Sequence, residues 1–288
     1  MKVLVTGARG QAGTALMEKT PRFAQAIPSS HADLDVTDES AVRRALAEYA
    51  PDWIINAAAY TAVDAAESDA AACLSLNATA VAILARAASD QGARLLHLST
   101  DFVFDGRASR PYAPEAATAP LNVYGSTKLQ GEHLARELAP ASIVLRTSWL
   151  YSRTGSNFVK TMLRLMSSRT ELGVVCDQVG SPTFASGLAD AAWRLIEVDA
   201  AAGVHHWSDC GVASWYDFAV AIGEEARQRG LLASIPSILP IRSDQYPCAA
   251  KRPSFSVLDC QRTRAAVGLP ATHWRVNLRN LLDDMATN

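Results

Sequence analysis

The stretch that decides the fold of this chain is Lys2-Val-Leu-Val-Thr-Gly-Ala-Arg-Gly-Gln-Ala-Gly13. Residues 2–5 form a short apolar run typical of a strand, three glycines follow within the next eight residues, and residues 14–19 read as a helix. A strand, a glycine-rich turn and a helix in this order open a dinucleotide-binding unit. The helix N-terminus offers free N–H groups to phosphates. The spacing is G-x-x-G-x-x-G, one residue longer than the commoner form, and an ordinary turn is the alternative reading.

Strand-like runs alternate with helical patterns over the first half of the chain. The strand candidates are residues 3–5, 53–56, 95–99, 143–146 and 174–176, and the first helices are residues 39–49, 70–91 and 124–138. Such alternation predicts right-handed crossovers and a parallel sheet with helices on both faces. We therefore expect an α/β, Rossmann-type doubly wound parallel sheet, with residues 1–151 as the dinucleotide-binding core.

After Trp149 the pattern breaks into pieces interrupted by proline and glycine. Helical patterns cover residues 157–168, 187–198, 214–229 and 274–285. We expect residues 152–288 to be a mixed segment that contributes one or two late strands to the sheet and forms a small C-terminal lobe for the substrate.

Composition excludes several classes of function. The 288 residues include 27 basic and 29 acidic side chains, a net charge of −2, without a run of like charges. This balance argues against nucleic acid or an anionic membrane as the main partner. The five cysteines are far apart and include no C-x-x-C pair. We therefore expect neither a disulfide framework nor a zinc cluster, and a protein that resides in the reducing cytoplasm. Met1 leads directly into the first strand, and we expect neither a signal peptide nor an apolar segment of membrane length.

Tyr124 and Lys128 are four residues apart, so they share one face of a helix. A free tyrosine has a pKa near ~10. A neighbouring cation favours the phenolate and makes the phenol a better proton donor to an oxygen that gains charge. Thr100 and Asp101 lie at the carboxyl end of a strand-like run. In an open parallel sheet, ligands bind outside the carboxyl ends of the strands. A Thr100 hydroxyl there can hydrogen-bond a substrate oxygen that Tyr124 protonates; capping of the next turn is the alternative.

Motifs spread over nearly the whole chain resemble the extended short-chain dehydrogenase/reductase family, and within it the dTDP-4-dehydrorhamnose reductases. They are the glycine turn, Asn56-Ala-Ala-Ala-Tyr-Thr-Ala-Val-Asp64, Ser99-Thr-Asp-Phe-Val-Phe-Asp-Gly106, Pro120-Leu-Asn-Val-Tyr-Gly-Ser-Thr-Lys128, Arg146-Thr-Ser-Trp-Leu-Tyr151, Asp177-Gln-Val-Gly-Ser-Pro-Thr183 and Arg252-Pro253. The resemblance implies NAD(P)H-dependent reduction of the 4-keto group of dTDP-4-dehydro-6-deoxy-L-mannose. Tyr124 would be the proton donor, Thr100 would orient the carbonyl, and Lys128 would tune Tyr124 and hold the nicotinamide ribose.

The resemblance also implies the residues that bind the cofactor. They are Gly7, Gly10, Gln11, Ala12, Gly13, Ser30, Asp35, Val36, Ala59, Tyr60, Thr61, Leu98, Tyr124 and Lys128. An NAD-selective site usually places a carboxylate about 20 residues past the glycine loop. Ser30 aligns with that position and residues 26–31 contain no carboxylate, so we expect NADPH to be accepted, and NADH as well. Asp35 is expected to hold the adenine together with Val36; as an alternative, it caps the helix at residue 39.

The substrate-binding candidates are Thr100, Asp101, Tyr124, Trp149, Asn157, Lys251 and Arg252. Trp149 would form an apolar wall beside the deoxyhexose, and the last three would meet the diphosphate, with surface positions as the alternative. No metal site is expected, because adjacent histidines such as His205 and His206 face opposite ways on a strand. Some family members form a dimer bridged by magnesium through two acidic positions. Those positions are Ala15 and Ser186 here, which disfavours magnesium and leaves a monomer or a homodimer.

Two other functions remain open. One is a different enzyme on the same scaffold, a nucleotide-sugar epimerase or a GDP-linked reductase. The other is a non-catalytic regulatory relative of the methionine adenosyltransferase beta subunit. Retention of the hydroxyl, the tyrosine and the lysine together disfavours the second alternative.

Overall fold

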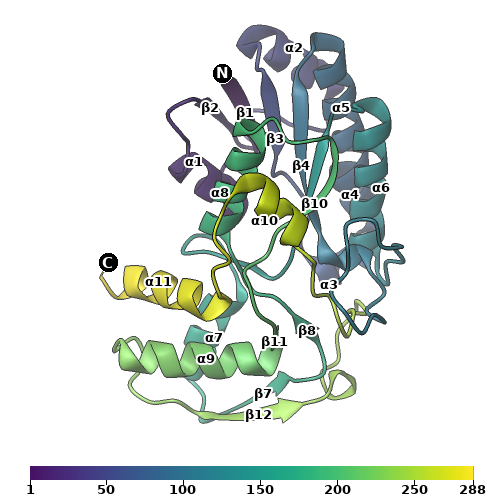
Figure 1. Cartoon of the computed structure of the whole chain (residues 1–288). Helices are drawn as coiled ribbons and strands as arrows, with labels where there is room; N and C mark the ends of the chain where they lie inside the picture. The colour runs from purple at the N-terminus through teal and green to yellow at the C-terminus, as the bar shows by residue number, and fades with distance from the viewer. Residues whose placement is uncertain (288) are drawn as a thin grey trace.

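A six-stranded parallel sheet forms the centre of the molecule, and the computed structural model describes residues 1–287 (Figure 1). The strand order is β2-β1-β3-β4-β5-β10, and each neighbouring pair is parallel. The bounds are Lys2–Thr6 for β1, Gln25–Ser29 for β2, Trp53–Asn56 for β3, Arg94–Thr100 for β4, Ile143–Thr147 for β5 and Gly203–His206 for β10. The predicted α/β, doubly wound parallel sheet is confirmed. Its order reverses between β1 and β3, which is where ligands bind in such sheets.

Helices cover both faces of the sheet because alternate strand residues point to opposite sides. Val3 and Val5 pack with α1 (Gln11–Glu18) and α8 (Ala185–Glu197). Leu4 packs on the other face, which is covered by α2 (Glu39–Tyr49), α5 (Ala80–Gln91) and α6 (Val123–Leu138). The apolar pattern gave no strand at β2, whose sequence Gln-Ala-Ile-Pro-Ser contains a proline. Proline is tolerated there because β2 is an edge strand.

The helical run from residue 70 to 91 corrects one expectation from the sequence. It consists of α4 (Ala70–Leu74), the π-helical turn η1 (Ser75–Thr79) and α5. At 22 residues it is long and apolar enough to cross a membrane, although no segment of that length was expected. Half of its most apolar window is buried inside the protein, and α5 packs between α2 and α6. The run is therefore a core helix of this fold, which explains its alanine-rich composition.

A smaller lobe lies below the carboxyl ends of the strands in Figure 1. Its core is formed by α7 (Phe158–Met166), α9 (Trp215–Gln228) and α11 (Trp274–Ala286). The strand expected at residues 174–176 is β7 (Glu171–Val175), which pairs with β12 (Ser237–Ile241) and not with the central sheet. The remaining short elements are α3 (Val63–Ala66), η2 (Asp101–Val103), β6 (Leu150–Tyr151), β8 (Val179–Gly180), β9 (Thr183–Phe184), β11 (Ala213–Ser214), η3 (Ser243–Gln245) and α10 (Gln261–Val267).

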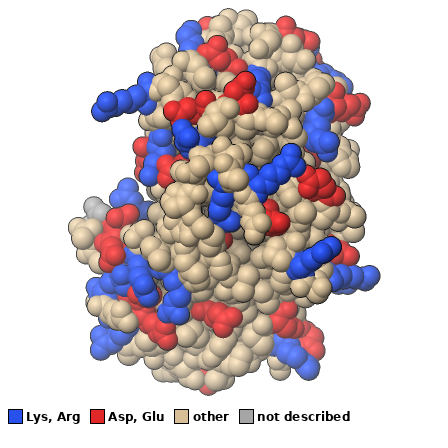
Figure 2. Space-filling view, in the orientation of Figure 1, with Lys and Arg blue, Asp and Glu red and all other residues tan. Residues whose placement is uncertain are grey.

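Charged side chains of both signs are interspersed on the face shown in Figure 2. Ion pairs at the surface of the protein include those of Arg43 with Glu39 and with Asp90. This face therefore does not present the single-sign field that would attract a polyanion.

Candidate active site

The glycine turn forms a cradle at the reversal point of the sheet. Gly7 has a φ of +66°, and a Cβ atom there would lie 2.6 Å from the Ala58 backbone nitrogen. A Cβ atom on Gly13 would lie 2.1 Å from the Gly7 carbonyl oxygen, so both positions require glycine. Gly10 is the N-cap of α1 and provides no side-chain cap. The first N–H groups of α1 therefore lie beside an exposed glycine and receive no hydrogen bond from an N-cap side chain. This arrangement fits a pyrophosphate.

Gln11 joins this cradle to the lobe. Its Oε1 accepts hydrogen bonds from Ser152 Oγ (3.0 Å) and Asn157 Nδ2 (2.9 Å), and its Nε2 donates to the Ser156 carbonyl (3.2 Å). Asn157 also caps α7 through Oδ1, which accepts from the Lys160 N–H. The structure therefore uses the Asn157 side chain at the junction between the glycine turn and the lobe.

A carboxylate stands at the end of β2, where the sequence indicated none. Ser30 follows the last residue of β2 and is buried. Asp33 folds back onto it, because the Ser30 N–H (2.9 Å) and hydroxyl (2.6 Å) both donate to Asp33 Oδ2. These bonds lower the pKa of Asp33, with a smaller contribution from the Arg9 charge. Residues 26–31 contain no carboxylate, as the sequence indicated, but the turn after β2 brings the Asp33 carboxylate back to Ser30.

Two further cofactor candidates lie in ordered loops. Asp35 accepts hydrogen bonds from the N–H (2.9 Å) and hydroxyl (2.7 Å) of Thr37, while the N-cap of α2 is Asp38. The alternative that Asp35 caps this helix is therefore wrong. Tyr60, in the loop after β3, is held at both backbone groups by Asn77: its N–H donates to Oδ1 (2.9 Å) and its carbonyl accepts from Nδ2 (3.1 Å). Sequence reasoning missed Asn77, which lies in the π-helical turn η1.

Tyr124 and Thr100 meet at the carboxyl end of β4. Tyr124 is the second residue of α6, whose N-cap, Asn122, accepts from the Gly125 N–H at 2.7 Å. A Cβ atom on Gly125 would lie 2.2 Å from the Phe102 carbonyl oxygen, so only glycine lets α6 approach η2 this closely. The Thr100 hydroxyl comes close enough to the Tyr124 phenol to act on its pKa.

The pKa of Tyr124 moves in the direction opposite to the one expected from the sequence. Burial raises it to about 12, which a hydrogen bond from Thr100 offsets in part and the charge of Asp101 reinforces. The Lys128 ammonium does not oppose this effect as expected, because Nζ donates to the Leu98 carbonyl (2.7 Å) and lies 3.3 Å from His97 Nε2. Burial in turn lowers the pKa of Lys128 to about 8. The phenol is therefore a firmly protonated group near neutral pH.

Asp101 is a second unusual acid beside Thr100. Its side chain is 1% exposed and its Oδ1 lies 3.1 Å from Thr100 Oγ1. Burial raises the pKa of Asp101 to about 7, although hydrogen bonds from Ser256 and Thr100 lower it. Asp101 thus titrates close to neutrality at the edge of the site.

The lobe contributes an aromatic wall. Trp149 adopts a φ of +45° and stacks on Trp215, with 3.4 Å between ring centroids and 2° between planes. A Cβ atom on Gly180 would lie 2.6 Å from the Trp149 indole, so this glycine makes room for the ring. Behind the stack is a cavity of about 450 Å³, lined by Phe158, Met162, Leu165, Arg169, Leu172, Gly173, Val174, Val175, Gln178, Trp215, Tyr246, Cys248 and Arg252.

Arg252 lines this cavity and joins it to α3. Its Nη2 forms an ion pair with Asp64 Oδ2 at 2.6 Å, and the Ala250 N–H donates to Asp64 Oδ1 at 3.1 Å. The Lys251 side chain is exposed, while its carbonyl accepts from Asn122 Nδ2 at 2.8 Å. Residues 250–252 therefore connect the loop after β3 and the start of α6 with the cavity of the lobe.

Comparison with known proteins gives the same assignment over the full length. Residues 1–287 match the family described as RmlD substrate binding domain. The chain is 39% identical to the dTDP-4-dehydrorhamnose reductase of Aggregatibacter actinomycetemcomitans, with 97% of this chain and 98% of the relative covered. The chain belongs to the dTDP-4-dehydrorhamnose reductase family. Within this family, the crystal structure of a Clostridium acetobutylicum reductase superposes with a TM-score of 0.93 at 37% identity, covering 99% of each chain.

A second reductase structure bears on the cofactor. The enzyme of Bacillus anthracis, solved in complex with NADP, superposes with a TM-score of 0.92 at 35% identity and covers 98% of this chain and 99% of its own. The resemblance to dTDP-4-dehydrorhamnose reductases drawn from the motifs is thereby confirmed.

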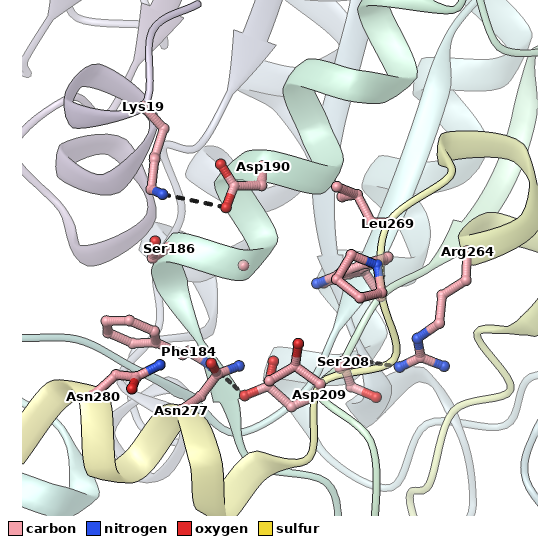
Figure 3. A pocket seen from close by; sticks show the side chains of 14 residues that line it. Lys19, Phe184, Ser186, Asp190, Ser208, Asp209, Arg264, Leu269, Asn277 and Asn280 are labelled. Carbon is pink, nitrogen blue, oxygen red and sulfur yellow. Dashed lines mark hydrogen bonds and ion pairs between the residues drawn. The ribbon is translucent and has the colours of Figure 1, made fainter.

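Two further hollows involve positions that the family resemblance singled out. Ala15 and Ser186 line one hollow, together with Glu18 and Asp284. A neighbouring hollow, shown in Figure 3, lies between α8 and α11, with the Lys19–Asp190 ion pair (3.4 Å) at its rim. Asp209 is buried there and accepts from the Phe184 N–H at 3.1 Å; burial raises the pKa of Asp209 to about 7. The two positions expected from this reductase family are thus neighbours, with a methyl group and a hydroxyl in place of carboxylates.

Proposed function

We propose that this protein reduces the 4-keto group of dTDP-4-dehydro-6-deoxy-L-mannose to give dTDP-L-rhamnose, with NADPH or NADH as the reductant. The observations that carry this proposal are the approach of Thr100 to Tyr124 at the carboxyl end of β4 and the bond from Lys128 Nζ to the Leu98 carbonyl of the same strand. The glycine cradle follows β1 and therefore lies at the same carboxyl edge of the parallel sheet. The aromatic wall of the lobe supports binding of a nucleotide sugar.

Tyr124 is the proton donor of the proposed reaction. The sugar oxygen gains negative charge as C4 is reduced, and a hydrogen-bonded phenol can transfer its proton to that oxygen. Thr100 orients the same oxygen through its hydroxyl. Because burial keeps the pKa of Tyr124 near about 12, the phenol stays protonated until an oxyanion or the charge of Lys128 comes close.

The cofactor residues proposed from the sequence fit a dinucleotide. Gly7, Gly10 and Gly13, with the start of α1, would receive the pyrophosphate, and Lys128 would hold the nicotinamide ribose. When bound, the reduced nicotinamide supplies the hydride. Ser30 and the carboxylate of Asp33 would meet the ribose at the adenine end, while the loop of Ala59, Tyr60 and Thr61 would line the middle of the cofactor.

The lobe cavity is the proposed site of the nucleoside. Its volume of about 450 Å³ lies within the usual range for small-molecule pockets. Phe158 and Trp215 line it with aromatic rings, and Gln178, which accepts a hydrogen bond from Trp215 Nε1 at 3.2 Å, lies beside them. Arg252 would meet the diphosphate between this cavity and Tyr124, with Lys251 next to it.

The proposal extends to the organisation of the molecule. Residues 1–151 are proposed as the dinucleotide-binding core and residues 152–288 as the segment that completes the sheet and binds the nucleotide sugar. A cytoplasmic enzyme, present as a monomer or a homodimer, is the setting that we infer for this reaction.

Turnover of the purified protein tests the proposed function. Mixing it with dTDP-4-dehydro-6-deoxy-L-mannose should oxidise NADPH or NADH and yield one dTDP-L-rhamnose per cofactor consumed. A protein that oxidises neither cofactor would refute the proposal. An absorbance spectrum of the protein as purified distinguishes a reductase from an epimerase, because an epimerase would retain its bound cofactor and show no net oxidation.

A further inference from the structure

A row of buried polar side chains crosses the sheet and ends at Lys128. Thr6 on β1, Asn56 on β3 and His97 on β4 are neighbours in register on three adjacent strands. Each of the three is at most 1% exposed. The Thr6 hydroxyl donates to Asn56 Oδ1 (2.7 Å), and Asn56 Nδ2 lies 3.1 Å from His97 Nδ1. On the other side of the ring, His97 Nε2 lies 3.3 Å from Lys128 Nζ.

The backbone fixes the direction of the hydrogen bonds in this row. The Ala58 N–H, which can only donate, points at Asn56 Oδ1 at 3.2 Å. The other end of the amide, the NH₂ group, must therefore face His97 Nδ1 and donate to it. A ring nitrogen that accepts carries no proton, so the proton of the neutral imidazole is on Nε2. Burial and the nearby Lys128 lower the pKa of His97 well below its usual value, so the ring is neutral.

This tautomer places an N–H donor opposite Lys128. A lysine ammonium has three donors and no lone pair, so it cannot accept from His97 Nε2–H, whereas the neutral amine can. The Leu98 carbonyl accepts from either form at 2.7 Å. The other titratable groups that act on Lys128 are Glu132, on its own helix, and the Cys73 thiol on α4.

Glu132 is itself occupied elsewhere. Both of its oxygens accept from the Arg146 guanidinium, and Oε1 also accepts from Ser99. The hydrogen-bond partners of the Lys128 nitrogen are a carbonyl, which suits either protonation state, and the ring nitrogen of His97, which suits only one.

We propose that His97 is a positioning residue of this enzyme, held as the Nε2–H tautomer by Asn56, and that this tautomer favours the neutral amine of Lys128 over its ammonium. The inference rests on the proposed function only for the role of Lys128 toward the cofactor. In the cofactor-free protein, Lys128 gives up its proton readily; ribose hydroxyls, which can accept from an ammonium, would favour its protonated form.

Nitrogen-15 NMR of the cofactor-free protein, labelled in its histidine rings, tests the tautomer directly. The resonances of His97 are assigned by their loss in a His97→Gln variant. We expect a protonated Nε2 and a bare Nδ1 at all pH values between about 6 and 9. A ring that carries its proton on Nδ1, or that becomes charged in this range, would overturn the proposal without any variant of Asn56.

An Asn56→Asp variant should reverse the row. One carboxylate oxygen can still accept from Thr6 and Ala58, while the other accepts from His97 Nδ1–H, which leaves Nε2 as an acceptor for the ammonium. The pKa of Lys128, followed by ¹³C NMR of labelled lysine, should then rise by about one unit or more. Thr6→Val is the matched control, because the Ala58 N–H still orients the amide; its ring tautomer and Lys128 pKa should not change.

Two outcomes of the variant experiment distinguish the effect of the new carboxylate charge on the Lys128 pKa from the effect of the His97 tautomer. If the pKa of Lys128 rises in Asn56→Asp while His97 keeps its proton on Nε2, the new charge acts alone and the proposal is wrong. If the tautomer reverses and the pKa of Lys128 does not rise, the ring has no influence on the lysine and the proposal is equally wrong. None of these readouts uses substrate, so a protein without reductase activity would refute the proposed function and leave this test intact.

Discussion

The two walls of the candidate active site are held by different interactions. The sheet wall consists of Thr6, Asn56, His97, Thr100 and the Tyr124–Lys128 turn of α6, and most of its polar side chains are held by hydrogen bonds to one another or to the backbone. The lobe wall consists of Trp149, Trp215 and the cavity behind them, and it is held mainly by ring stacking.

This difference suggests a division of labour. Hydrogen bonds between buried groups fix direction as well as distance, so the sheet wall can present a proton donor in one geometry. Aromatic faces tolerate sliding and still bury area, so the lobe wall suits recognition of a flat base. Variants of the sheet wall should therefore change kcat, and variants of the lobe wall should change KM.

The largest effect is expected from Tyr124→Phe. Loss of a positioned general acid typically lowers the rate by about 10²–10⁴-fold. We expect kcat of the reductase reaction to fall by this factor while KM for the nucleotide sugar changes little. Tyr49→Phe on α2, outside the site, serves as the control with unchanged kinetics. Full activity of Tyr124→Phe would mean that the proton comes from another group.

Asp101, beside Thr100, and Asp209, in the hollow between α8 and α11, should have similar effects on stability and different effects on activity. Asp101 and Asp209 each have a pKa of about 7 in the folded protein, raised from a usual value of 3.8. Between these values the folded state binds more protons than the unfolded state. Each group therefore stabilises the protein below about pH 4, and this contribution is lost as pH rises toward 7, at roughly 1.4 kcal/mol per pKa unit.

Urea unfolding at about pH 5 and pH 7.5 checks this sign. The free energy of unfolding should depend less on pH in both Asp101→Asn and Asp209→Asn than in the native protein. Only Asp101→Asn should alter the kinetics of reduction, because Asp101 contacts Thr100. Equal loss of activity in the two variants would contradict the separation of the site from the hollow around Asp209.

Trp215→Ala should weaken substrate binding through the lobe wall. Stacking of a base on an aromatic ring is worth about 1–3 kcal/mol, so KM should rise roughly tenfold or more, with kcat within a few-fold of the native value. Trp215→Phe keeps an aromatic face and should recover most of the affinity. A drop in kcat at unchanged KM would show that the lobe wall takes part in the chemical step.

A smaller change is expected at the adenine end of the cofactor. The Asp33 carboxylate, held by Ser30, would repel a 2′-phosphate. Asp33→Asn should therefore raise the ratio of kcat/KM for NADPH to that for NADH by about tenfold. Asp38→Asn, at the N-cap of α2, is a matched control without such an effect. An unchanged ratio in Asp33→Asn would show that another residue faces the ribose.

The sequence predicted those parts of the site that depend on local spacing. Gly7, Gly10 and Gly13 follow one strand directly, and Tyr124 and Lys128 are one helical turn apart, so short-range geometry places them. Asn77 and His97 escaped notice because their roles depend on the π-helical turn and on strand register. Such features arise only once distant segments pack.

Burial explains the remaining differences. The direction of the Tyr124 pKa was wrong because the spacing of Tyr124 and Lys128 says nothing about desolvation, which dominates here. Asp33 was missed because the turn that returns it to Ser30 has no strong sequence signal. The stack of Trp149 on Trp215 joins residues from separate parts of the chain, and no periodicity in either segment predicts it.

Transfer of deuterium tests the central claim most directly. The protein is given NADPH carrying deuterium at C4 of the nicotinamide, on either face in turn, together with dTDP-4-dehydro-6-deoxy-L-mannose. We expect one of the two cofactors to place deuterium on C4 of the sugar in dTDP-L-rhamnose, seen by proton NMR as loss of the H4 signal. Deuterium at another carbon, or product that forms without net oxidation of the cofactor, would contradict reduction at C4.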